Sequence, residues 1–255
     1  MEINFLGVGE ACDPARYNTS LLVSGRSGTK EYYILLDCGF TTPHRYFLGC
    51  SEKDQLDALW ISHFHGDHFF GVPLLLLRFS EMGRQKPLLV VGPLAVQEKV
   101  ELALELAYPS FMARLGYELH FLQLSPELAP FEAAGCLWRF APTEHSQSCL
   151  AVRLEAGGSS LFYSGDGCPT HASRNLARGC DLIVHESYRV DGKTANHGNM
   201  NDCVQMARQA EAGRLALVHV AHFERAFARS ALRDFAEKNI LPEMFLPEPG
   251  ERIEL

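Results

Sequence analysis

Residues 62–68 read Ser-His-Phe-His-Gly-Asp-His, and this string constrains the chain more than any other feature. It places three histidines and one aspartate in six positions, after the apolar segment LDALWI. Imidazole nitrogens and carboxylate oxygens are common ligands of zinc. So many ligand-type side chains beside a chain-turning glycine are hard to explain by packing, although a histidine-rich surface loop is the simpler alternative. The string therefore predicts a metal site at the end of a strand.

Further ligand-type residues follow other apolar segments. His145 follows WRFAPTE, Asp166 follows SLFYSG, and His222 follows LALVHVA. Loops at strand ends can meet at one edge of a layered fold, and catalytic residues commonly lie on such loops. A catalytic zinc ion keeps one position for water and lowers the pKa of that water to about 7. The residues suffice for two ions, one held by His63, His65 and His145, the other by Asp67, His68 and His222, with Asp166 as the bridge.

The composition narrows the class of protein. The chain has 255 residues, of which 47% are hydrophobic and 21% are charged, so a folded chain with a substantial core is expected. The formal net charge of −8 argues against a general electrostatic grip on nucleic acid. The longest apolar run, residues 69–77, is too short for a membrane span. The eight cysteines form no CxxC pair, and the acidic N-terminal segment does not resemble a signal peptide, so we expect free thiols and a cytoplasmic protein.

Short apolar runs that end in glycine predict strands in the first third of the chain, with a hairpin turn at GRSGTKE. A helix is expected over residues 67–82, with Pro73 in its early turns. Strands then alternate with helices at LAVQEKVELALELAY, MNDCVQMARQAEAG and RSALRDFAEKN, and RLALVHVAHF reads as a strand ending in a histidine. No repeat or linker interrupts this order. We expect one domain, residues 1–255, with two sheets and outer helices.

Beyond these patterns, SHFHGDHFFGVP resembles the signature of the metallo-β-lactamase superfamily. It is especially similar to the tRNase Z branch, in which Phe-Gly and a proline follow the motif. The segments MEINFLGVGEA, NTSLLV and LLDCG resemble the opening strands of that branch, and YSGDG resembles its bridging-aspartate motif. VHES, NHGN and VAHFER resemble its His-Glu, His-Ser-Thr and Thr-His-Phe-Ser-x-Arg segments. The matches run in family order from residue 1 to about 225.

This resemblance implies an α/β fold, the four-layer αββα sandwich, and a possible homodimer. It implies two zinc ions per chain, with Mn²⁺ or Fe²⁺ as alternatives, and attack of a metal-bridged hydroxide on a phosphodiester. Asp67 would orient or deprotonate the nucleophile, His197 would assist the leaving oxygen, and Glu186 would orient His197. His197 has a structural alternative as a residue near a helix cap. The implied metal ligands are His63, His65, Asp67, His68, His145, Asp166 and His222, whereas His185 and His219, inside apolar runs, are expected to pack or to support the ligands.

Three segments depart from the tRNase Z pattern. A long arm that grips tRNA lies in that branch between the counterparts of His145 and Asp166, where this chain has only residues 146–165. The Gly-Glu-Gly-Thr-Gln of the branch is replaced by residues 40–43, Phe-Thr-Thr-Pro, and His-Ser-Thr by His-Gly-Asn at 197–199. The catalytic parts are therefore present, whereas the parts that grip the substrate are altered.

Three hypotheses follow. The first is a dinuclear zinc phosphodiesterase of tRNase Z-like type, an endonuclease acting on RNA 3′ ends or an enzyme acting on cyclic nucleotides or small diesters. The second is a hydrolase of a thioester, lactone or sulfate ester on the same scaffold, because fold does not fix substrate. The third is a metal-binding module without activity, which would require a missing ligand. The cations considered for phosphate contact, each with a solvated face as its simpler interpretation, are Arg78, Arg84, Lys86, Arg225 and Arg229.

Overall fold

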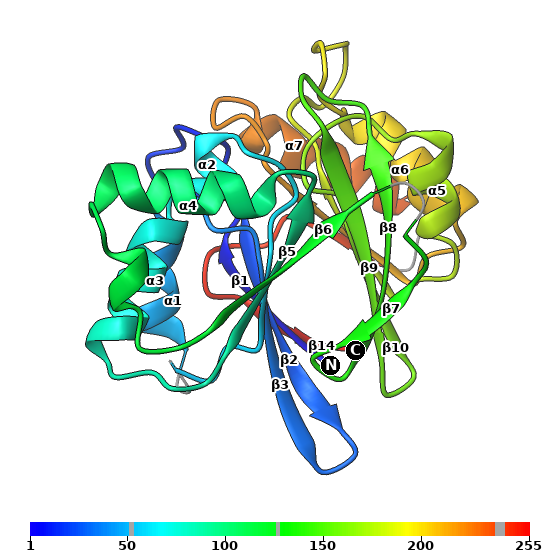
Figure 1. Ribbon diagram of the computed structural model, residues 1–255. Coiled ribbons are helices and arrows are strands. Elements are labelled where there is room, and N and C mark those ends of the chain that lie inside the picture. The colour runs from blue at the N-terminus through cyan, green and yellow to red at the C-terminus, as the bar shows by residue number, and fades with distance from the viewer. Residues whose placement is uncertain (51–53, 126–127, 238–242) are drawn as a thin grey trace.

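Two sheets pack face to face at the centre of the computed structural model, which describes residues 1–50, 54–125, 128–237 and 243–255 (Figure 1). The described strands of the first sheet run in the order β14-β1-β2-β3-β4-β5-β6. They are β1 (Glu2–Gly7), β2 (Ser20–Ser27), β3 (Lys30–Leu36), β4 (Ala58–Trp60), β5 (Leu88–Pro93), β6 (Leu119–Leu124) and β14 (Arg252–Glu254).

The second sheet mirrors this arrangement, with the order β13-β12-β11-β10-β9-β8-β7. Its strands are β7 (Phe131–Ala133), β8 (Cys136–Thr143), β9 (Cys149–Ala156), β10 (Ser159–Tyr163), β11 (Leu182–Glu186), β12 (Arg214–Val218) and β13 (Glu243–Phe245). Strands β3 to β6 are parallel to one another, as are β10 to β13. Each sheet therefore has a parallel part whose carboxyl-terminal strand ends lie at one edge.

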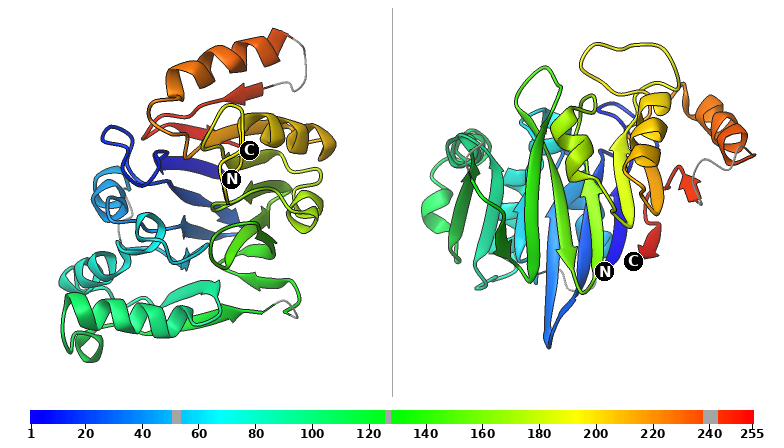
Figure 2. Two further views of the ribbon diagram at one scale, coloured as in Figure 1. Left: turned by 90° about the horizontal axis from the view of Figure 1, so that it is seen from above. Right: turned by 90° about the vertical axis from the view of Figure 1, so that its right-hand side faces the viewer.

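Helices cover the outer face of each sheet, so that four layers result (Figure 2). The first sheet carries α1 (Thr42–Gly49), α2 (Gly66–Phe69), α3 (Val72–Glu81), α4 (Val96–Ala107) and the short η1 (Met112–Arg114). The second carries α5 (His171–Leu176), α6 (Met200–Gln209) and α7 (Arg225–Glu237). This is the αββα arrangement predicted from the sequence. Among the described residues, no helix combines the length and the apolarity needed to cross a bilayer.

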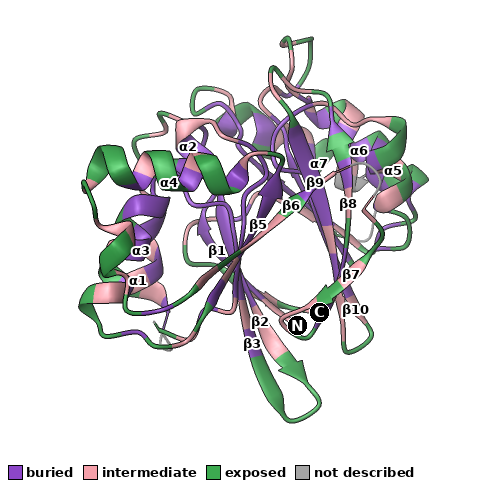
Figure 3. Cartoon of the chain, in the orientation of Figure 1, coloured by how far each residue is buried: buried purple, intermediate pink, exposed green. Residues whose placement is uncertain are grey.

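Most residues of the central strands are buried, as Figure 3 shows. Because their side chains alternate between the two faces of a sheet, they form three apolar cores, one between the sheets and one under the helices on each side. In β3, Ile34 and Leu36 point into the core between the sheets, whereas Leu35 points toward the helices. Trp60 and Trp138, both fully buried, meet between the sheets with ring centroids 6.1 Å apart. Because both faces of these strands are covered, they read as nearly continuous apolar runs in the sequence.

The structure confirms several expected elements and divides one of them. The hairpin turn between β2 and β3 is present, with Ser27 paired to Lys30. The helix expected over 67–82 is two helices, α2 and α3, which separate at Gly71. A Cβ at Gly71 would lie 2.1 Å from the carbonyl oxygen of Gly39, so the backbone must pass close to another segment there. Pro73 lies in the first turn of α3, as predicted.

Other elements differ from expectation. Helices α1 and α5 were not predicted, and the tail contains the short strands β13 and β14, of which β14 pairs with β1. The strand expected over RLALVHVAHF ends early, because β12 stops at Val218. The next residue, His219, has a left-handed backbone (φ 53°) and donates its N–H to the carbonyl oxygen of Val8. All eight cysteines are free thiols, six of them buried, as expected.

Candidate metal centre

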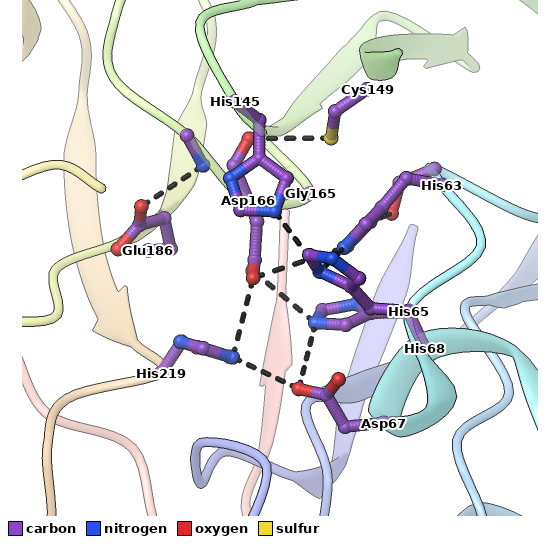
Figure 4. Close-up of polar contacts among 12 residues, drawn as sticks. His63, His65, Asp67, His68, His145, Cys149, Gly165, Asp166, Glu186 and His219 are labelled. Carbon is purple, nitrogen blue, oxygen red and sulfur yellow. Dashed lines mark hydrogen bonds and ion pairs between the residues drawn. The ribbon is translucent and has the colours of Figure 1, made fainter. Parts of the chain in front are cut away.

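Loops that follow β4, β8, β10 and β12 bring a cluster of histidines and aspartates to one edge of the two sheets (Figure 4). The histidine and aspartate donor atoms form two groups, each with its members within 4.8 Å of one another, and Glu186, His197 and His219 form a third group beside them. One group contains His63, His65, His145 and Asp166; the other contains Asp67, His68, Asp166 and His219. Asp166 belongs to both groups.

In the first group, three imidazole nitrogens face one another. His65 Nδ1 lies 3.1 Å from His63 Nε2 and 3.1 Å from His145 Nε2. A carboxylate oxygen of Asp166 lies 3.9 Å from His63 Nε2. Three nitrogens and one oxygen directed at one point are the donor set of a zinc-type site.

The second group adds two carboxylates to two imidazoles. His68 Nε2 lies 3.4 Å from Asp67 Oδ2 and 3.2 Å from Asp166 Oδ1. His219 Nε2 lies 3.2 Å from Asp67 Oδ2 and 3.4 Å from Asp166 Oδ2. The two Asp166 oxygens thus contact different members of this group, and Oδ2 also lies 3.9 Å from His63 Nε2 of the first group.

Local backbone geometry places these side chains. His65 precedes the single turn of α2, and this turn directs Asp67 and His68 into the cluster. Asp166 lies between Gly165 (φ 61°) and Gly167 (φ 102°), both in the left-handed region that favours glycine. A Cβ on Gly165 would lie 2.6 Å from the Ser62 side chain, so glycine is needed for close approach as well.

Three of the histidines have Nδ1 held by the protein, which leaves Nε2 directed into the cluster. Nδ1 of His63 lies 2.9 Å from Ser62 Oγ, Nδ1 of His68 lies 2.7 Å from Asp37 Oδ2, and Nδ1 of His145 lies 2.7 Å from the carbonyl oxygen of Asn196. A hydrogen bond at one ring nitrogen fixes the tautomer, so that the other can act as a ligand.

The electrostatics fit a cation. Burial raises the pKa of Asp166, but the adjacent His219 and His68 outweigh it and hold the pKa well below its usual range. Burial lowers the pKa of His219, but Asp166 and Asp67 outweigh it and raise the pKa to about 9. The cluster thus keeps both of its carboxylates, Asp67 and Asp166, negatively charged. His68 Nε2 and Asp166 Oδ1 are buried without a hydrogen-bond partner, and an ion between them would satisfy both.

The structure places His219, and not His222, in this cluster, which corrects the expected ligand set. His222 is half exposed, and its Nδ1 lies 2.9 Å from Glu10 Oε1. The cause is the early end of β12, which makes His219 the first residue beyond the strand. His219 was expected to pack or to support the ligands. The other six predicted metal ligands come together as expected: His63, His65, Asp67, His68, His145 and Asp166.

Glu186 and His197 form a pair at the border of the cluster. Glu186 is fully buried, and its carboxylate accepts N–H groups from Gly167, Tyr188 and Gly198. His197 Nδ1 lies 3.3 Å from Glu186 Oε1. Burial lowers the pKa of His197, but the hydrogen bond and charge of Glu186 outweigh it and raise the pKa. The carboxylate is rigidly held, so it can orient the imidazole, while His197 itself precedes the N-cap of α6, Asn199.

Two arginines considered for phosphate contact are structural instead. Arg84 is buried, and its guanidinium donates to four carbonyl oxygens, among them those of Asp54 and Leu56. Arg225 is also buried and donates to the carbonyl oxygen of Pro247. The other three form ion pairs: Arg78 with Glu81, Lys86 with Asp57, and Arg229 with Glu248.

Two further residues complete the account of the site. His185, expected to pack or to support the ligands, is fully buried, with Nδ1 2.8 Å from the carbonyl oxygen of Glu186. Asp37, which contacts His68, was missed, although LLDCG places an aspartate directly after an apolar strand, the same signal that marked Asp166.

Comparison with known proteins agrees with this geometry. Ribonuclease Z of Methanosarcina acetivorans is 27% identical over 275 residues, covering 87% of this chain and 88% of that protein. The metallo-β-lactamase fold protein YhfI of Bacillus subtilis superposes with a TM-score of 0.81 at 22% identity, over 100% of this chain and 98% of that chain. The short form of human tRNase Z gives a TM-score of 0.78 at 21% identity, over 100% and 99% of the two chains.

These similarities confirm the predicted fold. The chain has the metallo-β-lactamase fold, and the relatives that it resembles over most of its length are named ribonuclease Z and ribonuclease BN. A model of a narrower family, described as anti-Pycsar protein Apyc1, matches residues 1–239. Since this match covers nearly the whole chain, the protein is a member of the anti-Pycsar protein Apyc1 family.

Proposed function

We propose that this protein is a dinuclear phosphodiesterase that cleaves a small phosphodiester, with cyclic nucleotides as the first substrates to test. The observation that carries the proposal is the position of Asp166, whose carboxylate lies near His63 of the first donor group and near His68 and His219 of the second. Zinc fits the mixed imidazole and carboxylate donors, and Mn²⁺ or Fe²⁺ are alternatives. Pairs of ions held by a shared carboxylate are typical of enzymes that displace an oxygen at phosphorus.

The side chains have separate roles in this proposal. When bound, two divalent ions would supply positive charge to the phosphate and make the attacking water more acidic. Asp67, with Oδ2 between His68 and His219, orients that water or accepts its proton. His197 delivers a proton to the leaving oxygen, and Glu186 keeps its ring in position. The raised pKa of His197 suits a group that must carry this proton near neutral pH.

A short connection supports a small substrate. Strands β9 and β10, which link His145 to Asp166, are joined by a two-residue turn at Gly157 and Gly158. The branch that processes tRNA carries its gripping arm at this position. The net charge of −8 also disfavours a large polyanion. RNA 3′ ends remain the second candidate substrate, because relatives named ribonuclease Z and ribonuclease BN cover most of the chain.

The experiment compares four substrates with zinc-loaded protein: bis-nitrophenyl phosphate, a set of cyclic nucleotides, a tRNA precursor with a 3′ trailer, and a nitrophenyl thioester. Cleavage of the small diesters alone supports the proposal. Cleavage of the precursor as well would make the protein a compact endonuclease acting on RNA ends. Turnover of the thioester alone would refute a phosphodiesterase and favour the alternative hydrolase.

We further propose that the protein forms a homodimer, in the cytoplasm, through a groove between α4 and the segment from α2 to the start of α3. Phe70, Leu102 and Leu106 are exposed by 63%, 50% and 77%, and they line an apolar groove of about 600 Å³. The groove also includes Phe64, which lies between two metal-site histidines, so a second copy would lie beside the centre. Sedimentation of Leu106→Asp should show monomers, and Leu48→Asp, on exposed α1 outside the groove, should leave the dimer intact.

A further inference from the structure

Asp37 lies behind the metal centre and joins its two donor groups. It directly follows β3, is fully buried, and receives four hydrogen bonds. Its Oδ2 accepts from His68 Nδ1, Ser62 Oγ and Tyr163 OH, each at 2.7 Å, and its Oδ1 accepts the N–H of Ser62 at 2.7 Å. All of its partners are buried as well. Such a fully satisfied carboxylate has one orientation and imposes it on its partners.

Two hydrogen-bond paths connect the Asp37 carboxylate to histidines of the metal centre. The first is direct, since His68 belongs to the group with Asp67 and His219. The second passes through Ser62, whose hydroxyl donates to Asp37 and accepts from His63 Nδ1 at 2.9 Å. His63 belongs to the other group. One carboxylate therefore sets the tautomer of one histidine in each group.

We propose that Asp37 is the positioning residue of the metal centre, which presents Nε2 of His68 directly and Nε2 of His63 through Ser62, and so controls the affinity of both ions. The inference rests on the proposed two-ion site but not on the identity of the substrate. Removal of such a hydrogen-bond partner typically lowers metal affinity by about 10–100-fold.

Tyr163 connects Asp37 to the opposite sheet through a hydrogen bond. Its hydroxyl comes from β10, whereas Asp37 follows β3, so the contact spans the core between the sheets. Backbone contacts hold the same segment: Asp37 donates its N–H to the carbonyl oxygen of Trp60, and Cys38 donates to that of His68. Both sheets thus fix the position of Asp37, and Tyr163 restrains it without touching the donor atoms of either group.

The test is calorimetric titration of zinc into metal-free protein, together with the visible absorption of the Co²⁺-loaded form, which reports coordination geometry. Asp37→Asn should lower the affinity of both ions by about 10–100-fold. Ser62→Ala should weaken only one ion, the one held by the group that contains His63. Asparagine tolerates the left-handed backbone at this position (φ 60°), so the first variant keeps the local conformation.

Tyr117→Phe is the matched control, because it removes a buried phenol that donates to the carbonyl oxygen of Leu76, outside the cluster. It should leave both affinities unchanged, whereas Tyr163→Phe should lower them. If Asp37→Asn does not fold, as judged by circular dichroism, the Ser62 and Tyr163 variants still decide the question. Wild-type affinities in Asp37→Asn, or equal weakening of both ions in Ser62→Ala, would overturn the inference.

The result is separable from the proposed function. If the affinities change as expected but no phosphodiester is cleaved, the positioning role stands and the substrate assignment fails. If wild-type protein cleaves diesters but the variants bind metal normally, the proposed function stands and the role of Asp37 is wrong.

Discussion

Nε2 of His219 lies 3.2 Å from Oδ2 of Asp67, although 152 residues separate them in the chain. His222, three residues further on, pairs with Glu10 instead. The second donor group therefore depends on where β12 ends. The residue at which β12 ends decides which of the two histidines belongs to the centre.

His219→Ala should therefore lose one of two bound ions and at least about 100-fold in kcat, because the ligand and its contact with Asp67 both disappear. His222→Ala should keep two ions per chain and most of its activity. Metal content by plasma emission spectrometry, measured beside turnover of a small diester, checks both variants. Full metal content in His219→Ala would contradict the assignment.

Asp67 and Asp166 should respond differently to substitution. Asp166→Ala removes a carboxylate shared by both groups, so both ions should bind more weakly and activity should be lost. Asp67→Ala removes a member of the second group only, so one ion should remain at wild-type affinity while turnover falls by more than about tenfold. Zinc titrations of the two variants distinguish these outcomes. Two tightly bound ions in Asp166→Ala would exclude the bridging role.

The His197–Glu186 pair should control the alkaline side of the pH profile. His197 acts in its protonated form in the proposed mechanism, so kcat should fall as the pH rises through its raised pKa. Glu186→Gln removes the charge that raises this pKa, so the fall should move to lower pH. His197→Ala should abolish this alkaline fall of kcat, while the metal content stays at the wild-type level. If the fall occurs at the same pH in Glu186→Gln as in the wild type, another group carries the proton.

Chelation should lower the melting temperature. An ion that binds only the folded state at a free concentration 100 times its Kd stabilises that state by about 2.7 kcal/mol. For a chain of this size that corresponds to a shift of roughly 5–10 °C per ion. Scanning calorimetry with and without chelator measures the shift. Zinc-saturated chelator serves as the control, and an unchanged melting temperature with free chelator would argue against tight binding.

Arg84 should matter for stability and not for catalysis. Arg84→Met leaves four carbonyl oxygens without their donor, so the free energy of unfolding should fall by at least about 3 kcal/mol. Arg78→Met is the control, since Arg78 is exposed and pairs with Glu81 of the same helix. Urea denaturation gives the stability of both. Activity per folded molecule should remain unchanged. A loss of kcat without a loss of stability would instead indicate that Arg84 contacts the phosphate.

Short-range signals predicted most of this site. The string at 62–68 places four donors by local geometry alone, because α2 is a single turn that begins at Gly66. Asp166 could be predicted because it follows the apolar run SLFYSG. His219 could not, because a contact with Val8 ends β12 after Val218, and that contact is invisible in the sequence. Asp37 was not predicted for a similar reason, because its role depends on contacts with Tyr163 and His68, which are far away in the chain.

Both donor groups combine residues that follow strands of the first sheet with residues that follow strands of the second. Each bound ion would therefore act as a clamp between the two halves of the sandwich, much as a disulfide joins two segments. Separation of the halves would require release of both ions, so the loaded protein should unfold slowly as well as at higher temperature. Resistance to proteolysis would then report how fully the protein is loaded, without any knowledge of its substrate.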